Sequence, residues 1–121
     1  MAITRRVLSG SSFGKPIDIT GTASTAFTII HQGGPNTSTW DEVYIWAHNR
    51  ASMAITLLTY LGASTTANEI RTVIGGYSTE VIMPGTTLLG STTASDDCEI
   101  KAIIGICQTS IALFGYANRI T

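Results

Sequence analysis

A strict two-residue alternation in residues 40–49, WDEVYIWAHN, constrains the fold of this chain more than any other stretch. Successive side chains of a β-strand point to opposite faces, so this run has one apolar face and one mixed face. The apolar face carries Val43, Ile45 and Ala47, and the mixed face carries Glu42, Tyr44, Trp46 and His48. The alternation predicts a strand whose first face enters a core and whose second face is amphipathic.

Short runs of β-branched and apolar residues, separated by Gly, Pro, Asn and Ser, recur along the whole chain, and no window shows sustained helical periodicity with a cap at each end. A turn is expected at Pro84 and Gly85. The predicted strands are 17–20, 22–32, 40–49, 53–62, 69–75, 77–85, 86–91, 98–107 and 110–120. Eight or nine short strands predict an all-β fold, an antiparallel β-sandwich that is jelly-roll-like.

The 121 residues fit one domain, which would bury roughly two thirds of its unfolded surface. We expect a single sandwich over residues 17–121. Residues 1–16, which include the glycine- and serine-rich stretch GSSFG, are the only candidate appendage and are expected to form an extended N-terminal arm.

Charged residues make up only 12% of the chain, and the formal net charge is -1. Such a chain has no long-range field to attract nucleic acid, so no nucleic-acid partner is expected. Low charge also gives poor protection against association. Composition is therefore consistent with two alternatives, a subunit of a permanent assembly or an ordinary small β-domain.

The N-terminus carries the basic pair Arg5 and Arg6 but no apolar run after it, which argues against a secretory signal and favours synthesis in the cytoplasm. Residues 102–117 are apolar but are interrupted by Gln108, Thr109 and Ser110, so no membrane span is predicted. Cys98 and Cys107 would lie roughly 30 Å apart on opposite faces of one strand, which excludes a disulfide between them.

The stretch GSSFG matches the G-x-S-x-G pattern, with Ser12 in the nucleophile position. That motif works only where a strand ends in a strained turn and a helix begins directly after it. Here Lys15 and Pro16 follow instead. A flexible linker is the expected role of this stretch.

The other titratable groups give no catalytic or metal-binding pattern. His31 and His48 are the only histidines, and neither has a second ligand at short spacing. Asp41 and Glu42 are neighbours on a strand and point to opposite faces. Asp96 and Asp97 are expected in a solvated turn. We therefore expect no enzyme activity, no metal and no cofactor.

Aromatic residues on the 40–49 strand are the main candidates for a binding surface. Trp40, Tyr44 and Trp46 could belong to the core, anchor a subunit interface or stack on sugar rings. Because Tyr44 and Trp46 share their face with Glu42 and His48, an interface or a border between sheets suits that face better than a dry core.

Three stretches carry a resemblance to a known family: WDEVYIWAHNRASMAITLLTYLG, VIMPGTTLLG and the C-terminal ALFGYANRIT. With its hairpin, its P-G-T sequence and its terminal GYxNRI pattern, the chain from about residue 40 onwards resembles small structural proteins encoded in the morphogenesis regions of tailed bacteriophages.

The resemblance implies a virion protein, a capsid decoration or cement protein on the outside of the phage head. It implies a β-sandwich that forms homotrimers, binds the major capsid protein and has no catalytic residues. A neck, tail or fibre-associated protein, or a carbohydrate-binding or receptor-binding module, are the alternatives. On this interpretation the arm, strand 40–49 and two other arginines supply the interface: Ile3, Arg5, Arg6, Val7, Trp40, Tyr44, Trp46, His48, Arg50 and Arg119.

Overall fold

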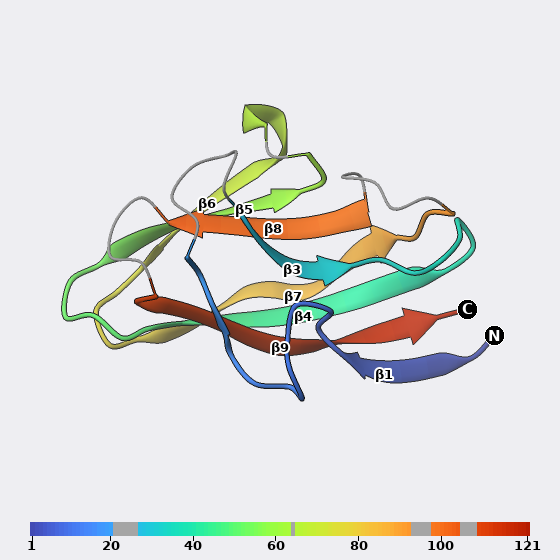
Figure 1. Ribbon diagram of the computed structural model, residues 1–121, viewed down its shortest axis with the longest axis horizontal. Helices are drawn as coiled ribbons and strands as arrows, with labels where there is room; N and C mark the ends of the chain where they lie inside the picture. The colour runs from blue at the N-terminus through green and yellow to red at the C-terminus, as the bar shows by residue number, and fades with distance from the viewer. Residues whose placement is uncertain (21–26, 64, 93–97, 105–108) are drawn as a thin grey trace.

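The structure, a computed structural model, describes residues 1–20, 27–63, 65–92, 98–104 and 109–121 (Figure 1). The regular elements of these residues are β-strands and one short 3-10 turn. They are β1 (Ile3–Val7), β2 (Ile17–Asp18), β3 (Thr28–Gln32), β4 (Trp40–Asn49), β5 (Ile55–Leu61), η1 (Thr66–Asn68), β6 (Glu69–Ile74), β7 (Thr79–Leu89), β8 (Glu99–Ile104) and β9 (Ile111–Ile120).

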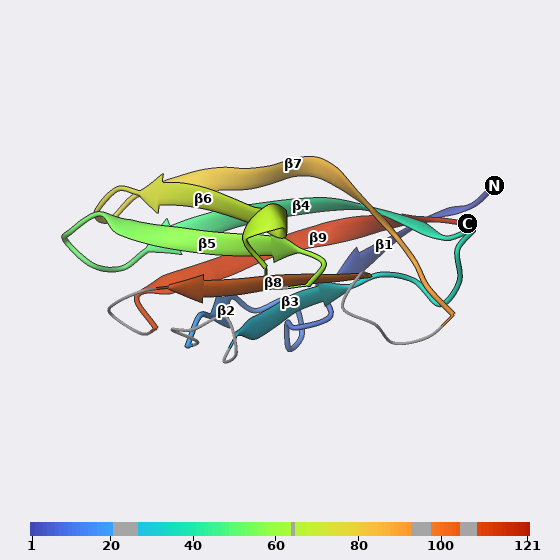
Figure 2. The ribbon, with the colours of Figure 1, turned by 90° about the horizontal axis from the view of Figure 1, so that it is seen from above.

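The strands form two packed antiparallel sheets. Figures 1 and 2 show them as two layers, and the strand axes of one layer are nearly aligned with those of the other. The five-stranded sheet has the order β1-β9-β4-β7, and β2 also pairs with β9. The four-stranded sheet has the order β3-β8-β5-β6. Because β1 and β2 share the same edge of β9, they occupy one strand position. Counted in this way, the two sheets have four strand positions each, and the described strands follow one another through them in the order of a jelly roll. This confirms the predicted fold class.

The core lies between the sheets and follows the predicted alternation. Along β4, buried residues alternate with half-buried ones, and the side chains of Val43, Ile45 and Ala47 are fully buried. β8 contributes Ile100, Ala102 and Ile104 to the same cluster. Each fully buried Val or Ile side chain stabilises the fold by about 1.5–3 kcal/mol. The period of two in the sequence thus selects the face that makes the core.

The turn predicted at Pro84 and Gly85 is wrong, because both residues lie inside the continuous strand β7. The pairing of β7 with β4 shifts register at two places, and Gly85 is skipped between Thr86 and Pro84. Gly85 has a φ of +95°, which glycine adopts without the steric cost of a side chain. Proline is tolerated there because β7 is an edge strand and the ladder is already interrupted by the bulge. The Pro-Gly pair therefore makes a β-bulge.

The N-terminal segment lies along the sandwich. Ile3–Val7 pair antiparallel with β9, and all five residues of this strand are exposed. Leu8 is fully buried in the core, and Ala2 exchanges both backbone hydrogen bonds with Thr121, at 3.2 and 3.0 Å. The predicted arm is thus extended where it forms β1. In this single chain it does not project from the domain along β1 but forms one edge of the five-stranded sheet.

Two other predictions fall partly on residues outside those described. Strand 22–32 is seen as β3 from Thr28, and strand 98–107 is seen as β8 up to Ile104. Cys98 is buried before β8, whereas Cys107 lies outside the described residues.

Candidate interaction surface

Four aromatic side chains form a cluster on the outer face of the five-stranded sheet; we call Tyr44, Trp46, Phe114 and Tyr116 the aromatic face. β4 and β9 pair so that Tyr44 is opposite Tyr116 and Trp46 is opposite Phe114. The ring centroids of these pairs lie 5.0 and 6.0 Å apart, and both pairs are stacked. Cross-strand aromatic pairs of this kind stabilise a sheet and form a preorganised apolar surface.

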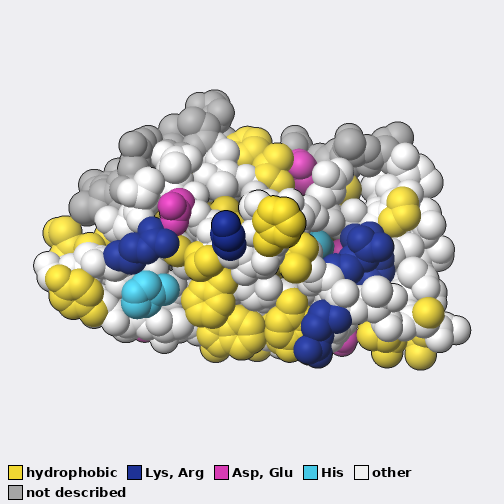
Figure 3. All heavy atoms as spheres, turned by 60° about the horizontal axis from the view of Figure 1, so that its bottom comes forward, with side chains coloured by type: hydrophobic (Ala, Val, Ile, Leu, Met, Phe, Trp, Pro, Cys, Tyr) yellow, Lys and Arg dark blue, Asp and Glu magenta, His cyan; other side chains and the backbone are white. Residues whose placement is uncertain are grey.

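Polar and charged groups border the aromatic face. The guanidinium of Arg5, on β1, lies 4.4 Å from the centroid of the Tyr116 ring, within the range of a cation–π contact. His48 Nδ1 lies 2.8 Å from Thr79 Oγ1 on β7. Figure 3 shows hydrophobic side chains gathered on this side of the molecule, with Lys or Arg side chains around them. An apolar centre with a polar border is the usual composition of a protein interface.

Gly115, between Phe114 and Tyr116, allows the two strands of the aromatic face to approach closely. A Cβ atom at this position would overlap the carbonyl oxygen of Tyr44. The glycine in the sequence FGY is therefore required by the backbone of β4.

The predicted interface residues on β1 and at the start of β4 are strongly exposed. Ile3 and Val7 are 64% and 53% exposed, and Trp40 is 51% exposed. Trp40, with Met1 and Ile120, lines a mainly apolar hollow of about 450 Å³. The hollow lies where the two chain ends meet. On the outer side of β4, Glu42 separates Trp40 from the aromatic face.

Two predicted interface arginines bind carboxylates of their own chain. Arg50 Nη1 donates to Asp18 Oδ1 and to the carbonyl oxygen of Thr109, each at 2.8 Å. Arg119 Nε and Nη2 donate to Asp41 Oδ1 and Oδ2 at 2.9 and 3.0 Å. Arg50 remains at the surface, whereas the Arg119 side chain is only 13% exposed.

Asp41 is the centre of a buried group that we call the polar network: His31, Asp41 and Arg119. Besides the two bonds from Arg119, the Asp41 carboxylate lies 2.7 Å from His31 Nε2. Burial raises the pKa of this carboxyl, but the hydrogen bonds from His31 and Arg119 outweigh that effect and hold the pKa at about 2, below the ordinary 3.8. The same hydrogen bond to Asp41 raises the pKa of Arg119.

Ser9 connects the polar network to the segment that follows β1. Its backbone N–H donates to His31 Nδ1 at 3.0 Å, and its Oγ lies 3.2 Å from the same nitrogen. Since Nδ1 accepts a backbone N–H, the ring proton lies on Nε2 and is donated to Asp41. Ser9 Oγ also accepts the Gln32 N–H at 3.1 Å. These bonds fasten the N-terminal segment to β3.

Ser9, His31 and Asp41 are the residue types of a nucleophilic triad, but their geometry does not suit one. A catalytic base must accept the proton of the nucleophile, and here the accepting nitrogen already holds a backbone N–H. His31 is also almost completely buried. The arrangement suits a structural role.

Sequence reasoning missed this network, although one signal was present. Asp41 is in phase with Val43, Ile45 and Ala47, so a carboxylate falls on the core-facing side of an alternating strand. Such a carboxylate needs buried partners. Which residues supply them is fixed by the packing of the two sheets for His31 and by the pairing of β4 with the remote strand β9 for Arg119.

Of the residues considered for catalysis in the sequence analysis, His31 and Asp41 meet in the polar network, and the others that the structure describes lie apart from them. Ser12 is exposed, His48 lies on the outer face near Thr79, and Asp96 and Asp97 lie outside the described residues. The described ranges contain no group of three or more His, Cys, Asp or Glu side chains that could hold a metal ion. They also contain no helix that is long and apolar enough to cross a membrane.

Comparisons with known proteins give no match: none is found among protein-family models, curated proteins or solved structures. Any functional conclusion therefore depends on the surfaces of this chain and on the pattern-level resemblance of its sequence.

Proposed function

We propose that this chain is a structural virion protein, a capsid decoration or cement protein that binds the outside of a phage head and stabilises contacts between major capsid subunits. The observation that carries the proposal is the aromatic face. Its rings are positioned by cross-strand pairing, bordered by polar groups, and close to an edge strand, β1, whose residues are all exposed.

The physical demands of a cement role agree with these features. A sheet face with few charges loses little free energy to desolvation when it packs against a neighbour, and aromatic anchors supply most of the gain. Among the described residues only β9 pairs with β1, so the other main-chain edge of β1 is open to a neighbouring strand, which needs no special side chain to pair there. Many symmetry-related copies then turn modest contacts into a stable attachment by multivalency.

Binding to phage heads that lack the protein tests the proposal. Wild type should co-sediment with the heads, and Trp46→Ala should lose at least about tenfold in affinity, as expected for an aromatic anchor. Val73→Ala is the matched control, because Val73 is exposed on the four-stranded sheet. Failure of wild type to bind heads, or equal loss in both variants, would contradict the proposal.

Truncation separates the contribution of β1 from that of the aromatic face. The deletion must end before Leu8 and Ser9, because Leu8 belongs to the core and Ser9 binds His31. Removing residues 1–6 should leave a folded domain. If β1 supplies the anchor, attachment to heads is lost, and unchanged attachment would assign binding to the aromatic face alone.

A homotrimer is part of the proposal, and light scattering on a sizing column measures it directly. We expect three copies per particle at micromolar concentration. A monomer that still binds heads would remove the trimer from the proposal and leave the decoration role. A neck, tail or fibre-associated position is the alternative placement. Gold labelling of the wild-type protein on virions, viewed by electron microscopy, would reveal it.

A carbohydrate-binding module is the second candidate function, favoured by Trp40, which is half-exposed beside an apolar hollow. The aromatic face fits this role less well, because its rings are stacked in pairs and each stacked ring already has one face against its neighbour. Glycan-array binding that is lost in Trp40→Ala, with the fold retained, would favour this function.

A further inference from the structure

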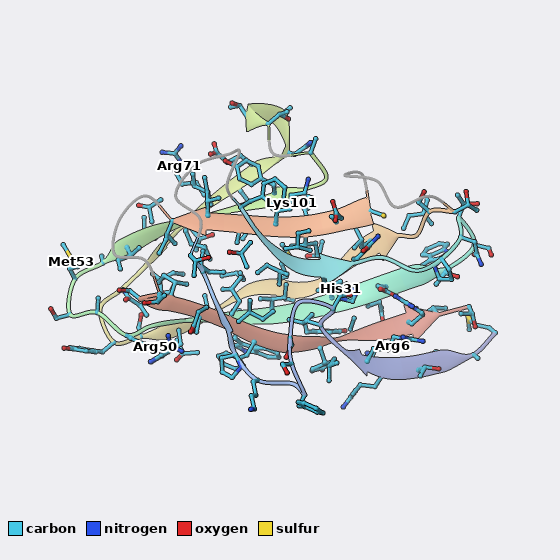
Figure 4. The ribbon with its side chains drawn as sticks, in the orientation of Figure 1. Arg6, His31, Arg50, Met53, Arg71 and Lys101 are labelled. Carbon is cyan, nitrogen blue, oxygen red and sulfur yellow. The ribbon has the colours of Figure 1, made fainter. Side chains whose placement is uncertain are left out.

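A polar pocket opens at the side of the sandwich where edge strands β1 and β3 meet, away from the aromatic face. Its volume is about 340 Å³, and its lining includes Arg6, Ser9, His31, Gln32 and Arg119. Figure 4 labels Arg6 and His31 in this region of the molecule. The pocket therefore lies directly over the polar network.

The two arginines of the pocket retain unused donors. Arg119 directs Nε and Nη2 to Asp41 and, among the described residues, no bond engages its Nη1. Within the same part of the chain, the Arg6 guanidinium has no hydrogen bond or ion pair. A guanidinium carries five N–H donors in a planar fork, so both side chains can bind an anion.

The charge of the pocket indicates what kind of anion fits. Asp41 neutralises one of the two guanidinium groups, and His31 is neutral when Nδ1 accepts the Ser9 N–H. The formal balance is therefore one positive charge. A carboxylate, which carries one negative charge and matches the guanidinium fork, balances it, whereas a phosphate dianion would leave an excess negative charge.

We propose that this pocket is a carboxylate-binding site, in which Arg6 and the free Nη1 edge of Arg119 hold the anion. The polar network positions Arg119 by fixing its other edge on Asp41. The site is independent of the proposed virion role, because binding requires only the folded chain. The carboxylate can belong to an acidic side chain or chain terminus of a protein, or to a small free acid.

Titration of the purified chain with acetate at constant ionic strength tests the proposal, with the side-chain N–H signals of Arg119 and His31 followed by NMR. Saturable shifts are expected in wild type. Arg6→Gln should weaken binding by about tenfold or more, as expected for loss of a charge-assisted fork. Arg6→Glu, which places a carboxylate beside Arg119, should abolish binding.

Arg5→Gln and Arg5→Glu are the matched controls. Arg5 is the neighbouring residue on β1 and its guanidinium lies over Tyr116 on the opposite face, so the net charge changes equally without a change in the pocket. Binding should change by less than about twofold, as expected for a distant, screened charge. Shifts that do not saturate, or equal weakening in the Arg5 and Arg6 variants, would overturn the proposal.

Competition then identifies the source of the carboxylate. Tighter binding of an acidic peptide with blocked ends than of acetate supports a protein carboxylate, and equal or weaker binding supports a small acid. Tighter binding of inorganic phosphate than of both would overturn the assignment, since the charge balance favours a monoanion. Circular dichroism of each variant confirms that the fold is retained.

Discussion

β4 and β9 carry the aromatic face on one side of their sheet and supply Asp41 and Arg119 of the polar network on the other side, where His31 of β3 completes it. On the outer side, Trp46 stacks on Phe114 and remains half-buried. On the inner side, Asp41 binds Arg119 and is fully buried. The apolar cluster therefore faces water and the ionic cluster faces the core, which reverses the usual distribution of side chains.

The difference shows that the two sides serve different purposes. Half-buried aromatic rings give up part of their possible burial and keep an apolar surface available for a partner. The buried ion pair contributes less than its hydrogen bonds indicate, because desolvation costs free energy, but removing one of its members is severe. We expect substitutions on the inner side to affect stability and substitutions on the outer side to affect association.

Asp41→Ala should have the largest effect on stability. It leaves the buried His31 and the largely buried Arg119 without their shared acceptor, so the free energy of unfolding should fall by about 3–5 kcal/mol. Urea denaturation measures this loss. Glu42→Ala, on the half-buried outer side, is the control and should cost about 0.5 kcal/mol or less. Similar losses in both variants would remove the proposed difference between the two sides.

Acid should weaken the inner side selectively. The pKa of Asp41 is lowered to about 2, so its stabilising contribution is complete above about pH 4 and is lost as pH falls through 2. The loss should be about 2 kcal/mol in the free energy of unfolding. Comparison of urea denaturation at pH 5 and pH 2 measures it. Asp41→Asn should lack this component, and an unchanged pH dependence in that variant would contradict the assignment.

The stacking of Trp46 on Phe114 should give a smaller, pairwise effect. A double-mutant cycle with Trp46→Ala and Phe114→Ala should show a coupling free energy of about 0.5–1.5 kcal/mol. A control cycle of Trp46→Ala with Val73→Ala, which lies on the other sheet, should show no coupling beyond experimental error. Coupling of equal size in both cycles would indicate a general weakening of the fold.

Ser9→Ala should have the smallest effect. It keeps the backbone N–H that donates to His31 and removes the hydroxyl, which accepts the Gln32 N–H in an exposed position and lies 3.2 Å from His31 Nδ1. A loss of about 0.5 kcal/mol is expected, with faster hydrogen exchange at the Gln32 amide. A loss above about 2 kcal/mol would show that the hydroxyl is essential to the network.

Prediction from the sequence succeeded where neighbouring residues hold the information. The alternation in residues 40–49 predicted which side chains of β4 face the core and which face outward. It failed at Pro84 and Gly85, where the local signal for a turn is also the signal for a bulge. Residues 1–16 were expected to form an arm, and the sequence held no sign that β1 would pair with β9.

The sequence by itself determined the all-β class, the inward face of β4 and the amphipathic character of its other face, because strand periodicity is a local property of the chain. Only the tertiary structure decided that Tyr44 meets Tyr116, that Asp41 meets His31 and Arg119, and that Arg6 joins Arg119 in one pocket. Most of these contacts join residues far apart in the chain, and even His31 and Asp41, ten positions apart, lie on strands of different sheets. Strand order and register choose the partners, and local sequence patterns do not contain them.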